Sequence, residues 1–245
     1  MTSLIQIEEP SARDPLEESG LAMGLDLGTD VLKVAISVGG NLAVVTSPGL
    51  NGFLPARLAR DAEGRFLGLP ENATPSSNDI PLGRDDLVRS AEEERAAETF
   101  AEHLRALLRL ARLELGQRTR RPVTAAVAVV PTHFDRAARL LWMSAIEGAG
   151  LDILNLLDEP VAVALALGLD RQDGRYGWIS PDGTEAAVVE AAEGRLSLKA
   201  AIRPDSLAEA ANFLREWGIE RPMEVPEPAT AAVIGAALLA EELGR

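Results

Sequence analysis

The stretch VTAAVAVVPTHFDRAARLLWMSAIEGAGLDILNLLDEPVAVALALG, residues 123–168, decides the fold class. Its first eight residues are a continuous run of small apolar side chains, which is typical of a strand buried on both faces. Residues 135–149 then place their apolar side chains on one helical face, and residues 151–157 return to a strand pattern. A helix follows from Pro160, a favoured first helical residue, to Gly168. The order of strand, helix and strand predicts an α/β fold.

A three-strand pattern stands on either side of this unit. Residues 21–46 are predicted to form three antiparallel strands separated by two glycine-containing turns. Residues 176–202 repeat this order of strands and turns about 150 residues later, which predicts an internally duplicated chain. The patterns then predict a helix capped by Asp205 or Ser206 and a final helix over residues 228–243.

The segment after the first three strands is predicted to contain short strands, a loop and a long helix. Residues 53–69 predict two short strands, and residues 70–89, rich in Pro, Asn and Ser, predict a loop. Ser90 opens a capping box, and the apolar stripe that follows predicts a long helix ending at Gly116.

Composition and charge exclude several classes of protein. The 245 residues contain 38 acidic and 24 basic side chains, a net charge of -14, so the surface repels nucleic acid and anionic membranes. No cysteine is present, which excludes disulfides, thiolate nucleophiles and Cys-ligated metals. Residues 1–20 have five acidic side chains and no signal-peptide pattern, and no apolar run reaches membrane-spanning length. We therefore expect an acidic flexible tail and a soluble, cytoplasmic protein.

Four motifs together resemble one family. They are GLDLGT at residues 24–29, VPTHF at residues 130–134 followed by Arg139, LLDEPVAVALALG at residues 156–168, and the helical run at residues 228–237. The third motif is similar to the family run N-E-P-T-A-A-A-L-A-Y-G. In this combination the chain resembles the ATPase domain of the Hsp70 family, within the actin, hexokinase and Hsp70 superfamily.

The resemblance implies a specific architecture. It is the two-lobed actin-like ATPase fold, also called ribonuclease H-like, with a duplicated β-meander plus helices and, in this chain, a shortened second lobe. We expect the tail at residues 1–20, a first lobe at residues 21–168 with an insert at about residues 47–121, and a reduced second lobe at residues 169–245.

The resemblance also implies a nucleotide site in the cleft between the lobes. Asp26 would hold a hydrated Mg²⁺, since that ion prefers carboxylate, water and phosphate oxygens. Backbone N–H groups at Gly28 and Thr29 would face phosphate, and Glu159 would orient the attacking water as the catalytic carboxylate if the site is active. The positions implied for ATP or ADP binding are Asp26, Gly28, Thr29, Asp30, Gly183, Thr184 and Gly235.

The sequence departs from the family at the positions that hydrolysis needs. Where the family has Asp-Leu-Gly-Gly-Gly-Thr, this chain has Ile179, which has no carboxylate for metal, then Pro181, which has no N–H, and Asp182, which adds negative charge. Asn72 stands where the family places an essential Lys. Only 24 residues lie between the last strand and the final helix, where the family carries a subdomain that holds adenine.

Asp30 is a further departure, because the family has Thr at this turn. We expect Asp30 to lie next to Asp26 and to face Asp182 across the cleft, where three carboxylates would exclude nucleotide. On this hypothesis, changing Asp30 to Thr restores binding of Mg-nucleotide.

Three functional hypotheses follow. The first is a pseudo-ATPase of the Hsp70 type that serves as a protein-binding or regulatory module, without enzymatic activity and with weak or absent binding of ATP or ADP and Mg²⁺. The second is a minimal chaperone-like ATPase that binds Mg-ATP and switches its lobe angle with nucleotide. The third is an assembling actin-like scaffold, which the acidic surface does not favour. The expected partner is a protein, and neither nucleic acid nor a membrane.

Overall fold

The computed structural model describes residues 20–45, 53–61, 63, 66–68 and 79–244. The expected tail at residues 1–19, Asn72 and part of the insert therefore lie outside the described residues. In chain order the elements are β1 (Leu21–Leu27), β2 (Val31–Val38), β3 (Asn41–Val44), β4 (Leu54–Pro55), β5 (Arg57–Arg60), β6 (Phe66–Gly68), β7 (Ile80–Pro81), α2 (Arg84–Ala91), α3 (Glu94–Thr119), β8 (Val123–Val130), α4 (Arg136–Gly148), β9 (Asp152–Asp158), α5 (Glu159–Ala166), η1 (Leu169–Arg171), β10 (Gly174–Ile179), β11 (Ala186–Ala192), β12 (Arg195–Ile202), α6 (Leu207–Glu216) and α7 (Ala231–Leu243).

The central sheet has the strand order β3-β2-β1-β8-β9, with β4 paired to β2. β2 is antiparallel to both of its neighbours, β1 and β3, whereas β1, β8 and β9 run parallel. Parallel neighbours need a crossover, and α4 supplies it between β8 and β9. The predicted α/β class and the predicted strand, helix, strand unit are confirmed.

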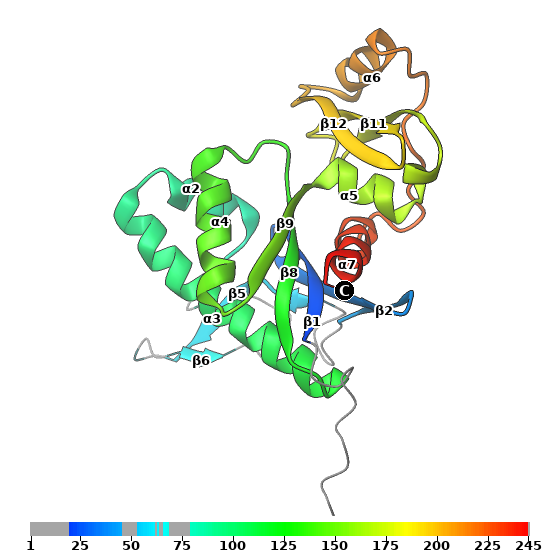
Figure 1. Cartoon of the computed structure of the whole chain (residues 1–245). Coiled ribbons are helices and arrows are strands. Elements are labelled where there is room, and N and C mark those ends of the chain that lie inside the picture. The colour runs from blue at the N-terminus through cyan, green and yellow to red at the C-terminus, as the bar shows by residue number, and fades with distance from the viewer. Residues whose placement is uncertain (1–19, 46–52, 62, 64–65, 69–78, 245) are drawn as a thin grey trace, which may run out of the picture.

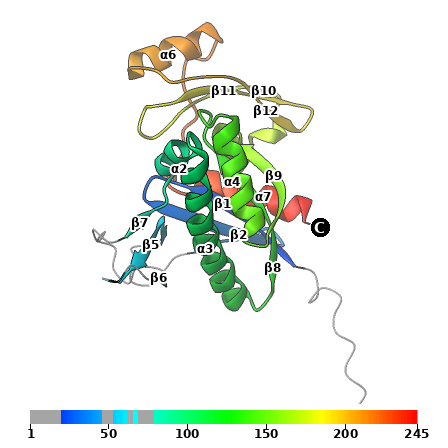
Figure 2. The ribbon, with the colours of Figure 1, turned by 90° about the vertical axis from the view of Figure 1, so that its left-hand side faces the viewer.

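Helices cover both faces of this sheet (Figures 1 and 2). Alternate side chains of β1 and β8 enter two different cores, because successive side chains of a strand point to opposite faces. Met23 and Leu25 pack in the core that includes side chains of α3 and α4, whereas Ala22 and Val127 pack in the core that includes side chains of α5 and α7.

Two glycines let α7 lie between β1 and α5. A Cβ atom at Gly24 in β1 would lie 2.5 Å from the backbone nitrogen of Ala237 in α7. A Cβ atom at Gly235 in α7 would lie 1.9 Å from the carbonyl oxygen of Ala162 in α5. Real side chains cannot approach that closely, so both positions require glycine for this layering.

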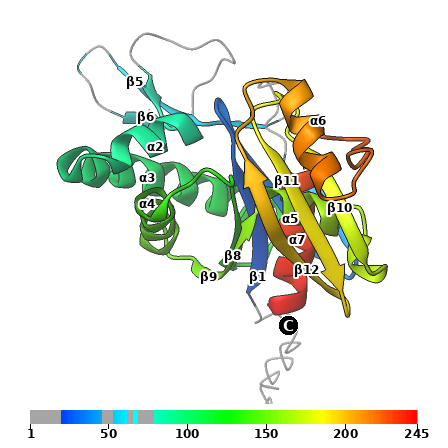
Figure 3. The same cartoon turned by 90° about the horizontal axis from the view of Figure 1, so that it is seen from above.

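The second predicted meander is also present. Strands β10, β11 and β12 form a separate antiparallel sheet that follows α5 in the chain. Figure 1 shows this sheet with α6 on one side and α5 and α7 on the other, and Figure 3 shows the same sheet from above. Trp178, 2% exposed, packs from β10 into the same core as Ala162 of α5. The division into two lobes at residue 169 stays a prediction.

The predictions between the meanders need correction. The segment at residues 70–89, expected to be a loop, contains β7 and the start of α2. The long helix begins at Glu94, with Glu93 as its N-cap, and not at Ser90. It also passes Gly116 and ends at Thr119, since one glycine is tolerated in a helix whose apolar stripe continues to a buried Leu115. Of the two expected caps, Ser206 is the N-cap of α6 and accepts a hydrogen bond from the Glu209 N–H. The final helix begins at Ala231 and not at Pro228.

Within the described ranges, no helix combines the length and apolar character that crossing a membrane requires.

Candidate functional site

The predicted magnesium ligand, Asp26, is already paired with a cation of the chain. Asp26 is the sixth residue of β1 and is 6% exposed. The register of the β1–β2 hairpin places Lys33 directly opposite it. The Lys33 Nζ lies 2.7 Å from Asp26 Oδ2, a distance typical of a charge-assisted hydrogen bond. The sequence analysis did not identify Lys33 as a site residue.

In the turn that follows Asp26, both the N–H and the carbonyl of Gly28 already form backbone hydrogen bonds. The Gly28 N–H donates to the Val31 carbonyl at 2.8 Å, which closes the hairpin. The Arg84 N–H donates to the Gly28 carbonyl at 2.9 Å. A Cβ atom at Gly83 would lie 1.8 Å from the Thr29 carbonyl oxygen, so the start of α2 packs directly on this turn.

Glu159, the predicted catalytic carboxylate, lies near Arg84. Glu159 is the first residue of α5, directly after the strand β9, and its side chain is 15% exposed. The Arg84 Nη1 lies 3.8 Å from Glu159 Oε2. Burial of the carboxyl, reinforced by the negative charge of Asp26, raises the pKa of Glu159 to about 8, against the opposing effect of Arg84. At neutral pH the carboxyl is therefore mostly protonated.

A second arginine fixes the segment from which Glu159 projects. The Arg139 Nη2 lies 2.7 Å from Asp158 Oδ1, and its Nε donates to the Phe134 carbonyl at 3.0 Å. Arg139 therefore joins the turn after β8 to the end of β9, as expected for side chains at the carboxyl ends of neighbouring parallel strands.

The turn between β10 and β11 is closed by its own side chains. Asp182 Oδ1 accepts hydrogen bonds from Ser180 Oγ at 2.6 Å, from Thr184 Oγ1 at 2.8 Å and from the Thr184 N–H at 3.1 Å. Gly183 has a φ of 74°, a conformation that favours glycine. Both predicted nucleotide-binding residues, Gly183 and Thr184, thus serve this turn. Although burial works in the other direction, these hydrogen bonds and Arg84 lower the pKa of Asp182 to about 2.

Asp182 also reaches across to α2. Its Oδ2 lies 3.3 Å from Arg84 Nη2, so one guanidinium contacts both Glu159 and Asp182. Arg84 was not predicted as a site residue. The structure thus brings Glu159, Asp182 and the Gly28 turn together around Arg84.

Glu185 makes a further contact between the two sheets. It precedes β11, and its side chain is 4% exposed. The carboxylate accepts hydrogen bonds from the Thr132 N–H at 3.2 Å and Thr132 Oγ1 at 2.6 Å, and it pairs with His133 Nδ1. Burial alone would raise the pKa of Glu185, but the hydrogen bonds from His133 and Thr132 hold it below its usual value.

Asp30 has neighbours other than those expected. It is exposed and, with Thr29, lines a pocket of about 350 Å³ beside α2. The described lining includes Asp79, Asp85 and Asp86, but neither Asp26 nor Asp182. The arginines of this pocket are Arg57 and Arg89.

Gly235, expected at the nucleotide, has a packing role in the structure. It lies in the second turn of α7 at the close contact with Ala162 described above.

The groups present do not fit Mg-ATP in the way the resemblance implied. A Mg²⁺ ion at Asp26 would lie beside the ammonium of Lys33, and a divalent and a monovalent cation about 4 Å apart repel by about 8 kcal/mol at an effective dielectric of about 20. In the described part of the chain, no group of three or more His, Asp or Glu side chains is arranged to hold a metal ion. Ile179 ends β10 at the position of the family's second metal carboxylate.

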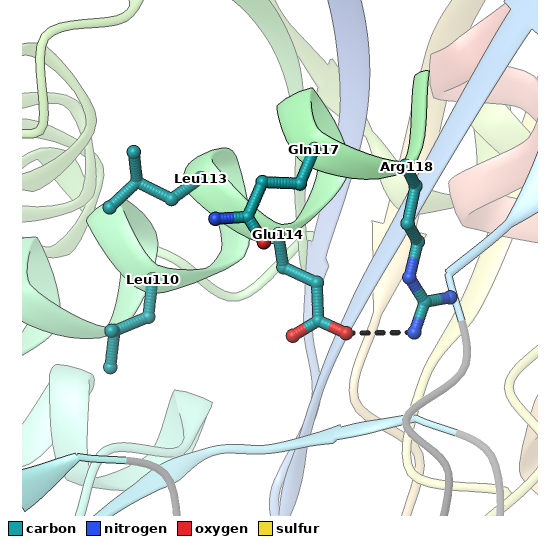
Figure 4. A pocket seen from close by; sticks show the side chains of 5 residues that line it. All are labelled: Leu110, Leu113, Glu114, Gln117 and Arg118. Carbon is teal, nitrogen blue, oxygen red and sulfur yellow. Dashed lines mark hydrogen bonds and ion pairs between the residues drawn. The ribbon is translucent and has the colours of Figure 1, made fainter. Parts of the chain in front are cut away.

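Two further pockets, both lined by described residues, lie away from this site. One of about 480 Å³ lies along the C-terminal half of α3 and is drawn in Figure 4. Its side chains include Leu110 and Leu113, with Glu114 paired to Arg118 at 2.7 Å. Another, of about 450 Å³, lies between α5 and α7 next to Gly40.

Comparison with known proteins identifies similar chains. The family model of the Hsp70 protein matches residues 87–194, which include Glu159 and the turn at residues 180–185. Three of the most similar curated relatives are named chaperone protein HscA homolog. The protein from Chromobacterium violaceum is 30% identical over 205 residues, which is 71% of this chain and 32% of that protein.

The other two relatives match over similar lengths. The protein from Acinetobacter baylyi is 28% identical over 195 residues, covering 70% of this chain and 32% of its own length. The protein from Azoarcus sp. is 30% identical over 198 residues, which is 69% of this chain and 31% of that protein. The chain thus spans about a third of the length of the curated relatives it matches.

Proposed function

Since this chain carries an Hsp70-like ATPase domain, we propose that it is a pseudo-ATPase, which keeps the fold of the domain and serves as a protein-binding or regulatory module. Domains of this family generally bind ATP or ADP with Mg²⁺. In this chain, the cations that contact the carboxylates of the site are the side chains of Lys33 and Arg84.

The internal ion pairs of the site carry the proposal. Lys33 lies on Asp26 and Arg84 lies on Asp182, so the negative charges of these two carboxylates are already compensated by side chains of the chain. An incoming metal would have to displace Lys33 from a carboxylate that is 6% exposed. That displacement would leave an ammonium largely buried without its partner, which is costly.

The protonation of Glu159 agrees with this proposal. A carboxyl that orients or deprotonates an attacking water must be ionised in the working enzyme. With a pKa of about 8, set by burial and by Asp26, Glu159 is ionised in only a minor fraction of molecules at pH 7. The ligand-free protein therefore holds this carboxyl mainly in the form that cannot accept a proton.

Release of phosphate from ATP tests the proposal. We expect wild-type protein to match a buffer blank in the presence of Mg²⁺. The matched control is Glu159→Ala prepared in parallel, because a contaminating ATPase does not respond to a change in this chain. A wild-type rate above the blank that falls to background in Glu159→Ala would overturn the proposal.

That outcome would favour the second hypothesis, a minimal Mg-ATP-dependent, chaperone-like ATPase. Retention of Asp26, Glu159 and the Gly28-Thr29 turn is the observation in its favour. The same measurement therefore separates the two hypotheses.

A further inference from the structure

We propose that Arg84 and Glu185 form an inter-sheet clasp, a pair of side-chain contacts that fixes the second sheet against the first in the absence of any ligand. The inference rests on the proposed function, because it assigns to side chains of this chain the role of holding the two sheets together. It concerns the conformation of the chain, and it is measured independently of ATP hydrolysis.

The first half of the clasp is the contact of Arg84 with Asp182. Arg84 is the first residue of α2, and its backbone is anchored on the central sheet through the hydrogen bond to Gly28. Its Nη2 reaches Asp182 Oδ2, at 3.3 Å, in the turn of the second sheet. The Arg84 side chain is 24% exposed and the Asp182 side chain is 46% exposed, so solvent screens much of this pair and it fixes the direction of the contact more than it adds stability.

The second half of the clasp is the contact of Glu185 with the turn after β8. The carboxylate accepts from both the N–H and the hydroxyl of Thr132, and His133 pairs with the other oxygen. Hydrogen bonds to an ionised and buried acceptor are among the stronger contacts of a protein. This half of the clasp is therefore the more stable one.

Both contacts act on the same rigid turn. Ser180 Oγ accepts from the Glu185 N–H at 2.9 Å, and the Ser180 N–H donates to the Glu185 carbonyl at 2.9 Å. Together with the hydrogen bonds to Asp182, they fix the shape of residues 180–185. Because residues 180–185 join β10 to β11, the contacts that Asp182 and Glu185 make with the first sheet also restrain these two strands.

The clasp adds directional polar contacts to the apolar packing between the second sheet and α5. The second sheet rests on α5 through small side chains such as Ala162, Ala187 and Val189. Contacts of this kind have little directional preference and allow one layer to slide on another. The ion pair and the hydrogen bonds of the clasp are directional, so they select one angle between the sheets.

Distance measurements between spin labels test the inference. The chain has no cysteine, so Glu102→Cys in α3 and Ala208→Cys in α6 provide the two label sites. Both positions are exposed, and α6 packs on β11 through Leu214 and Val188. We expect one narrow distance distribution without nucleotide, unchanged by Mg-ATP. In the labelled Arg84→Gln/Glu185→Gln variant we expect the distribution to widen about twofold or to split.

The control variant is Arg89→Gln, which removes an exposed ion pair with Asp86 inside the same helix as Arg84 and should keep the narrow distribution. Circular dichroism shows whether each variant is folded, and the single Arg84→Gln variant replaces the double one if the latter unfolds. A broad distribution in wild type, or a clasp variant as narrow as wild type, would overturn the clasp whether or not the protein hydrolyses ATP. A narrow ligand-free distribution together with ATPase activity would overturn the proposed function alone.

Discussion

Lys33 Nζ and Asp26 Oδ2 lie 2.7 Å apart on opposing residues of the β1–β2 hairpin. Asp26 is the residue that the family resemblance assigned to Mg²⁺. The pairing of β1 with β2 places the Lys33 ammonium next to the Asp26 carboxylate. The pair joins the fold to the proposed loss of function, because the same contact that stabilises the hairpin competes with a metal ion.

Removing Lys33 should therefore destabilise the protein. In Lys33→Met the carboxylate of Asp26 stays in a largely buried site without its partner, and we expect a loss of about 3 kcal/mol in the free energy of unfolding by urea titration. The double variant Asp26→Asn/Lys33→Met should recover much of this loss. Arg89→Gln, which breaks an exposed pair with Asp86, should change stability by at most about 0.5 kcal/mol. A loss in Lys33→Met no larger than in Arg89→Gln would contradict the importance of the pair.

Stability should depend on pH through Glu159. The groups that face it are Asp26 from β1, Lys33 from β2, Arg84 from α2 and Glu185 from the turn before β11. The folded protein raises the pKa of Glu159 from 4.5 to about 8, so the folded state binds more protons than the unfolded state between these values. The contribution of Glu159 to stability must then fall as the pH rises through this window.

The Glu159→Gln variant lacks this titration. We expect its free energy of unfolding, relative to wild type, to increase from about pH 4.5 to about pH 8 by on the order of a few kcal/mol and to level off above that. The lowered pKa of Glu185 acts only below its ordinary value of 4.5, so it does not enter this window. Parallel pH profiles of the two proteins would rule out the raised pKa.

Gly235 should matter for packing in the absence of any nucleotide. Its Cβ in Gly235→Ala would collide with the Ala162 carbonyl, and overpacking of this kind costs about 1–3 kcal/mol or more. The matched control is Gly116→Ala in α3, where the nearest atom is 3.3 Å away and helix propensity favours alanine by up to about 1 kcal/mol. Thermal unfolding of both variants checks the difference, and equal melting temperatures would contradict it.

The effect of Asp30→Thr should be small. Asp30 is exposed and lies beside α2, and the cations of the site are not among its described pocket neighbours. We therefore expect the substitution to leave binding of Mg-ATP undetectable by equilibrium dialysis, with exposed Asp85→Asn as the control. Submillimolar binding in Asp30→Thr alone would support the original hypothesis that this charge excludes nucleotide.

Much of the fold could be predicted because its signals are local. The run at residues 123–130 and the helix after it follow hydrophobic periodicity, and both meanders follow alternation broken by glycine turns. The helix α2 was missed because the preceding Pro- and Ser-rich segment obscured an element of 8 residues. Its start depends on the contact of Gly83 with Thr29, which no local pattern contains.

The site was predicted only in part for a similar reason. Asp26 and Glu159 came from motifs, whereas Lys33 requires counting the register across the hairpin, a step that the sequence allowed. Arg84 and Glu185 act through partners about 100 and 50 residues away in the chain, so only the tertiary fold brings their charges together.

The proposal that the nucleotide site has been replaced by internal ion pairs is tested most directly by isothermal titration calorimetry of wild-type protein with ATP and ADP in the presence of Mg²⁺. The chaperone protein HscA homolog of Chromobacterium violaceum serves as the comparison protein under the same conditions. We expect no saturable heat from this chain up to millimolar nucleotide. A micromolar dissociation constant for either nucleotide would contradict the account.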